Sequence, residues 1–235
     1  MSTRREFLAA ALGGFPGFGA PPAIPLHTIR NGRSKRRYLW IHGNERTARA
    51  VLLDHIKRYR GTANLVRSNT RNIRLFDGVI DPNRLFSRTG AEKNLRTLNP
   101  RWTAEKVAKA LDRLDRGRDR TVRAVFPPKD GLLIALHNNS EGYSVNDEVA
   151  ISDRVSLRDE THPHEFFLCT QERDFEILKT APNNVVLQNR ASKEDDGSLS
   201  RLAAARGVRY VNLEVALGNA EQQREMLDWA ERHLP

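Results

Sequence analysis

The sequence predicts an α/β fold with a mostly parallel or mixed central sheet and helices on both faces. Short apolar runs typical of buried strands alternate along the chain with longer helical patterns, which is the arrangement of βαβ units. The expected strands cover 38–41, 63–66, 122–126, 132–136, 166–169, 185–187 and 208–213. The expected helices cover 45–59, 102–116, 171–180, 198–206 and 219–233. The segment 84–101 has a weaker pattern and more charge, so we expect a loop there.

The domain organisation that we expect is an export signal at 1–23, a linker at 24–36 and a single domain at 37–235. Ser2-Thr3-Arg4-Arg5-Glu6-Phe7-Leu8 matches a twin-arginine export signal, and the apolar stretch that follows is too short to span a bilayer permanently. The basic run from 30 to 37 fits a linker. We therefore predict an exported protein, periplasmic or extracellular, without a transmembrane segment after removal of the signal.

The amino-acid composition indicates which kinds of binding partner to expect. The formal net charge is +10, which favours anionic ligands or surfaces. Basic residues are spread along the whole chain, and only three Trp and four Tyr are available to stack on bases, so we predict no nucleic-acid partner. An anionic cell-wall (peptidoglycan) peptide is the partner that fits an exported protein. The single cysteine, Cys169, excludes an intramolecular disulfide, and its apolar surroundings predict a buried residue.

The motif His42-Gly43-Asn44-Glu45 directly follows the apolar run 38–41 and precedes a helical pattern. An imidazole and a carboxylate at the end of a strand are ligands that suit Zn²⁺. A second His-x-x-Glu, at 162–165, precedes the strand 166–169 instead of following it. Ligands in open α/β sheets bind at the carboxyl ends of strands, so we prefer the first copy. His162 and His164 are left with three readings: they line the cleft, bind a second metal or cap a loop.

Two further strands end in residues of the same chemistry. The run 132–136 ends in His137, and the run 208–213 ends in Glu214. Between the two histidines lies Asn83-Arg84, in the turn-like segment Ile80-Asp81-Pro82-Asn83-Arg84. The sequence thus predicts that His42, His137 and Glu214 meet at one edge of the sheet.

These motifs, IHGNE, IDPNRLF, ALHNN and NLEVALG, resemble the zinc carboxypeptidase superfamily, which includes carboxypeptidase A-like peptidases and the succinylglutamate desuccinylase and aspartoacylase deacylases. The resemblance spans 38–234. It implies a zinc-peptidase architecture, with His42, Glu45 and His137 as zinc ligands, Glu214 as general base, and Asn83 and Arg84 as the pair that binds a substrate carboxylate.

The resemblance also implies an arginine that stabilises the developing oxyanion, upstream of the Asn-Arg pair. Arg67, Arg71 and Arg74 are candidates, and Arg74 is preferred because it is nearest to that pair. Tyr143 is a candidate substrate-contacting phenol. The implied activity is zinc-dependent hydrolysis of an amide bond in a small carboxylate-bearing peptide. The alternatives are a deacylase of N-acyl amino acids and a non-catalytic protein that binds an anionic ligand.

Overall fold

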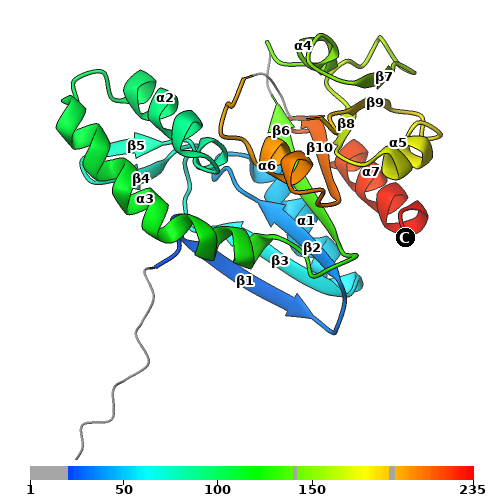
Figure 1. Ribbon diagram of the computed structural model, residues 1–235. Helices are drawn as coiled ribbons and strands as arrows, with labels where there is room; N and C mark the ends of the chain where they lie inside the picture. Colours follow the sequence, from blue (N-terminus) through cyan, green and yellow to red (C-terminus); the bar gives the residue numbers. More distant parts are fainter. Residues whose placement is uncertain (1–20, 140–141, 191–193) are drawn as a thin grey trace, which may run out of the picture.

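The computed structural model describes residues 21–139, 142–190 and 194–235, and within them the architecture is α/β (Figure 1). The described residues form one eight-stranded mixed sheet with the order β1-β3-β2-β6-β10-β8-β9-β7. Its strands are β1 (Leu26–Asn31), β2 (Arg36–Trp40), β3 (Gly61–Val66), β6 (Leu132–Asn139), β7 (Arg154–Ser156), β8 (Phe166–Cys169), β9 (Asn184–Leu187) and β10 (Tyr210–Ala216). A separate hairpin consists of β4 (Ile73–Leu75) and β5 (Gly78–Ile80).

The centre of the sheet is parallel: β3, β2, β6 and β10 run in the same direction. Every residue of β3 and β6 is buried, as expected for central strands covered on both faces. The carboxyl ends of these strands lie at one edge of the sheet. The single cysteine, Cys169, is buried in β8, as predicted.

Helices cover both faces of the sheet. They are α1 (Arg46–Arg58), α2 (Arg88–Leu98), α3 (Ala104–Val125), α4 (Val145–Val149), α5 (Glu172–Leu178), α6 (Leu199–Ala205) and α7 (Ala220–His233), with a short 3₁₀ turn at Pro82–Arg84. Helices α1 and α7 pack together behind the sheet, and α3 and α6 lie in front of it (Figure 1). Among the described residues, no helix is both long and apolar enough to cross a membrane.

A lobe beside the sheet contains the β4–β5 hairpin and α2, which packs against α3 (Figure 1). In this lobe, Gly90 lies very close to Gly197 of the main body. A Cβ added to Gly90 would lie only 2.2 Å from the backbone nitrogen of Gly197, so no side chain fits between them. Gly197 has a φ of +74°, and its carbonyl accepts a hydrogen bond from the Phe86 N–H. This contact fixes the segment after Asn83 and Arg84 against the start of α6.

Three expectations about secondary structure were wrong. The segment 84–101 contains helix α2, because the Ser87 hydroxyl caps its first turn and Ala91 and Leu95, four residues apart, are buried on one face. Residues 122–126 form the last turn of α3 and not a strand, because Val122 and Val125 continue the helical apolar stripe.

The third concerns the expected linker at 24–36, which contains β1, an edge strand antiparallel to β3. Ile24 is already buried, and the N–H of Ala23 donates to the carbonyl of Gly117 in α3. The folded body therefore begins before residue 26. The twin-arginine motif at Ser2–Leu8 lies outside the described residues.

Candidate metal centre

Three parallel strands deliver the predicted side chains to one edge of the sheet. His42 follows β2, His137 lies in β6, and Glu214 lies in β10 directly opposite His137 in the parallel register. All three line the same cavity. The spatial convergence expected from the strand ends is therefore present.

Glu45 joins them from the residue before α1. Its side chain makes no capping bond to the helix and instead turns toward the two imidazoles. The Trp40 indole N–H donates to the Glu45 carbonyl at 2.7 Å, which ties the turn to β2. The turn also needs Gly43, since a Cβ there would lie 2.3 Å from the carbonyl oxygen of Ser68.

The two imidazoles and the carboxylate face one another at short range. His42 Nδ1 lies 2.7 Å from Glu45 Oε1, and His137 Nδ1 lies 3.3 Å from Glu45 Oε2. One ligand atom from each residue falls within a group no more than 4.8 Å across. All three residues are buried.

This donor set fits a zinc-type ion. Two imidazole nitrogens and one carboxylate oxygen are the three protein ligands of many catalytic zinc sites, which keep one further position open. Glu45 Oε2 is buried and forms no hydrogen bond of good geometry among the described residues; its neighbour is His137 Nδ1 at 3.3 Å, which leaves the oxygen available to ligate a cation. His42, Glu45 and His137 could therefore hold a metal ion.

Asp81 supports this group and has no role in the sequence-based prediction. Its Oδ1 lies 2.8 Å from His42 Nε2 and also accepts a hydrogen bond from the backbone N–H of Asn83. When His42 Nε2–H donates to this carboxylate, Nδ1 is left as a lone pair facing Glu45, the arrangement that orients histidine ligands in metal proteins. In the sequence, Asp81 directly follows Ile80 and stands two positions before Asn83, and this position is the signal that could have indicated its role.

The charges of the group shift its pKa values. Burial alone would lower the pKa of His42, but Glu45 and Asp81 outweigh it and raise the pKa to about 9. Burial alone would raise the pKa of Glu45, but His137 and His42 lower it to about 2. The pKa of Asp81 is also lowered, because the bond to His42 and the charge of Arg71 outweigh its burial. Both acids are thus ionised near neutral pH.

Glu214 stands beside these residues with a different environment. Its Oε1 accepts a hydrogen bond from Asn212 Nδ2 at 2.9 Å. Burial raises the pKa of its carboxyl, His137 opposes this rise and Glu45 adds to it. A carboxyl with a raised pKa suits a residue that must accept and return a proton.

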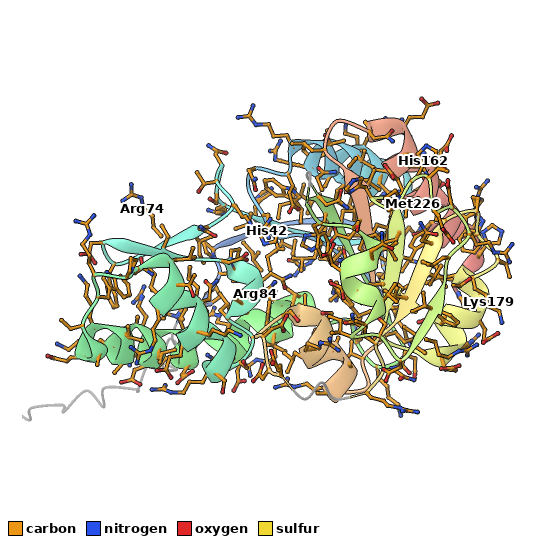
Figure 2. All side chains as sticks on the ribbon, turned by 90° about the horizontal axis from the view of Figure 1, so that it is seen from above. His42, Arg74, Arg84, His162, Lys179 and Met226 are labelled. Carbon is orange, nitrogen blue, oxygen red and sulfur yellow. The ribbon has the colours of Figure 1, made fainter. Side chains whose placement is uncertain are left out.

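The structure places Arg71 at the site, and the preference for Arg74 was wrong. Arg71 Nη1 lies 3.4 Å from Glu45 Oε1 and Nη2 lies 3.3 Å from Asp81 Oδ2. Arg74 points outward, far from His42 (Figure 2). The reason is the alternation of β4, in which its two neighbours Ile73 and Leu75 are buried and Arg74 faces solvent. Arg67 is exposed and lines a different depression, next to β1.

A cavity of about 460 Å³ opens over the centre, and Asn83, Arg84 and Tyr143 all line it. His42 and Arg84, labelled in Figure 2, both line it. Asn83 Oδ1 accepts a hydrogen bond from the Leu199 N–H, so the amide is oriented by α6. Arg84 Nη1 lies 3.6 Å from Asp196 Oδ2, a half-exposed pair that a ligand carboxylate could replace.

The second His-x-x-Glu does not line this cavity. His162 lies on an exposed turn with its Nδ1 2.7 Å from Asp159, well away from His42 (Figure 2). His164 Nδ1 bonds the carbonyl of Tyr143 at 2.7 Å. Both histidines therefore brace loops. The strand-edge argument against this copy was nevertheless wrong, because β8 runs antiparallel to β10 and begins opposite Glu214.

No family model and no curated protein matches this chain. Among solved structures, it is similar to a succinylglutamate desuccinylase/aspartoacylase from Rhodobacter sphaeroides, with 16% sequence identity and a TM-score of 0.45. The match covers 89% of this chain and 59% of that chain, so this chain spans less than two thirds of the length of that protein.

Proposed function

We propose that this protein is a zinc-dependent hydrolase that cleaves an amide bond in a small substrate with a free carboxylate. The observation that carries the proposal is the buried group of His42, Glu45 and His137, whose ligand atoms lie within 4.8 Å of one another beside Glu214. Two imidazoles and a carboxylate that converge on one buried point form the donor set of many catalytic zinc sites.

His42, Glu45 and His137 would hold the metal. When bound, zinc supplies Lewis acidity toward the scissile carbonyl and makes water a stronger nucleophile near neutral pH. Asp81 holds His42 in one orientation through the bond to Nε2. A residue that fixes a ligand in this way contributes to metal affinity without touching the ion.

Glu214 is the general base of the proposed reaction. Asn212 occupies its Oε1, which leaves Oε2 to take a proton from water and to return it to the leaving nitrogen. Arg71 is the cation for the negative charge that develops on the carbonyl oxygen, because its guanidinium reaches the metal ligand Glu45. A donor in this role is worth about 2.7–4 kcal/mol of transition-state stabilisation.

Arg84 and Asn83 bind the substrate carboxylate. The planar guanidinium can donate two parallel hydrogen bonds to a carboxylate, and Asn83 presents its amide N–H₂ once Leu199 has engaged the oxygen. A cavity of about 460 Å³ is of the size that accepts a short peptide or an acyl-amino acid. Peptidoglycan peptides and N-acyl amino acids are the two substrate classes to be compared, and the second would make the protein a deacylase.

The test combines metal analysis with turnover. The purified protein is expected to bind one zinc ion and to release products from muropeptides or N-acyl amino acids, detected by mass spectrometry. Glu214→Gln should keep its zinc and lose about 10²–10⁴-fold in kcat, the range of general acid–base catalysis. Glu225→Gln, an exposed change of the same charge on α7, is the matched control. Zinc-loaded protein that cleaves neither class, or full turnover in Glu214→Gln, would overturn the proposal.

A further inference from the structure

Besides Glu45, Asp196 and Glu214, a further carboxylate, Glu148 of α4, lines the cavity. Glu148 Oε1 accepts a hydrogen bond from the Tyr143 hydroxyl at 2.7 Å, and its Oε2 accepts one from the Gln188 amide. Gln188 is only 1% exposed, so the group that holds this carboxylate is part of the protein interior. Glu148 itself is half-buried and remains open to the cavity.

Both hydrogen-bond partners of Glu148, Tyr143 and Gln188, are neutral. Among the residues that the structure describes, no Lys or Arg forms an ion pair with Glu148; Arg84 pairs with Asp196 instead, and Arg201 also lines the cavity. An ionised carboxylate that is fixed by neutral donors and faces a cavity favours a cationic ligand there.

The same cavity therefore offers both signs of charge to a ligand. Arg84 and Glu148, which belongs to α4, both line it. Tyr143 lines the same cavity and donates its hydroxyl hydrogen to Glu148. A ligand that satisfies both groups carries a carboxylate and an ammonium.

We propose that Glu148 is a specificity-determining residue that binds an ammonium group of the substrate while Arg84 binds its carboxylate. The inference rests on the proposed function in that it assumes a substrate with a scissile amide bond. The preference for an ammonium group can be measured without hydrolysis. The ammonium can come from the side chain of the carboxyl-terminal residue or from a free α-amine on the acyl side, and the ligands of the test separate these two sources.

Binding is measured by calorimetry with zinc-loaded Glu214→Gln, in which the ligand stays intact. Three ligands are compared: acetyl-alanyl-norleucine, which has no amine; acetyl-alanyl-lysine, which has a side-chain amine; and alanyl-norleucine, which has a free α-amine. One amine-bearing ligand should bind about tenfold more tightly than acetyl-alanyl-norleucine, the value of one hydrogen bond to a charged group. Which of the two it is identifies the position of the ammonium.

Three added substitutions show whether the charge of Glu148 causes the preference. Glu148→Gln should reduce the preference to about twofold or less, whereas the exposed control Glu225→Gln should retain it. Tyr143→Phe removes a donor to Glu148 but keeps its charge, so the preference should persist. A role of Glu148 only in positioning Tyr143 predicts that both substitutions change binding of all three ligands equally.

The outcomes are separable from those of the proposed function. A protein with Glu214 intact that hydrolyses no substrate would refute the hydrolase proposal, and the binding preference would still be measured. Equal affinity for all three ligands would overturn the role of Glu148, even in a protein that hydrolyses amides. This comparison uses the chain with Glu148 in place, so it does not depend on the folding of a Glu148 variant.

Discussion

Asp81→Asn is the most informative perturbation of the proposed metal centre, because it leaves the three ligands in place. Asp81 contacts His42 Nε2 at 2.8 Å and is buried with it. The amide has nearly the same shape as the carboxylate and loses its charge. The change therefore tests whether this carboxylate orients and polarises His42 as a ligand.

The expected magnitude follows from the type of bond. A hydrogen bond that involves a charged group contributes about 1.5–3 kcal/mol, which corresponds to a change of roughly 10–150-fold in an equilibrium constant. Carboxylates that support histidine ligands typically contribute about 10–100-fold to metal affinity. Asp81→Asn should thus weaken zinc binding by about 10–100-fold, and part of the loss arises because Arg71 loses its partner at Asp81 Oδ2.

The assay is competition for zinc between the protein and a chromophoric chelator of known affinity, near neutral pH. Asp77→Asn is the matched control, because Asp77 is exposed at the tip of the β4–β5 hairpin and pairs with Lys106 away from the cavity. Zinc affinity should fall in Asp81→Asn and stay within about twofold of the unchanged protein in Asp77→Asn. Unchanged affinity in Asp81→Asn, or an equal loss in both, would refute this reasoning.

Three other outcomes are expected. Arg71→Ala should lower kcat by about 10²–10³-fold, as for the loss of an oxyanion donor, whereas Arg74→Ala should leave kcat unchanged; steady-state kinetics of both variants decides between the two arginines. Gly90→Ala should reduce the free energy of unfolding by about 1–3 kcal/mol, measured by urea denaturation, because the added Cβ meets backbone at 2.2 Å; a fully stable variant would contradict the close packing. In the metal-free protein, the pKa of His42 is raised from 6.5 to about 9, so its stabilisation is complete below 6.5 and is lost as the pH rises through 9. Denaturation at several pH values should show this decline, and His42→Asn should not.

The parallel centre of the fold could be predicted because its strands are buried on both faces. Such strands read as continuous apolar runs, and β2, β6 and β10 were each found from one. Since parallel strands end at the same edge, residues that follow them are brought together, and this rule placed His42, His137 and Glu214 correctly relative to one another.

The rest of the site depends on contacts that no local pattern encodes. Arg71 and Arg74 are three residues apart, and only the fold decides that Arg71, just before β4, reaches Glu45 and Asp81 whereas Arg74 does not line the cavity. Glu148 acquires its place in the cavity from a bond to Gln188, forty residues further along the chain. The direction of β8 could not be predicted from the sequence either, because a short apolar run has the same pattern in a parallel and in an antiparallel pair.

The most direct test of the metal centre is anomalous diffraction at the zinc absorption edge from crystals of the zinc-loaded protein. The proposed function predicts one strong peak within coordination distance, about 2.0–2.2 Å, of the Nδ1 atoms of His42 and His137 and of a carboxylate oxygen of Glu45. A map with no peak between these three side chains, or with its peak at another group of residues, would contradict it.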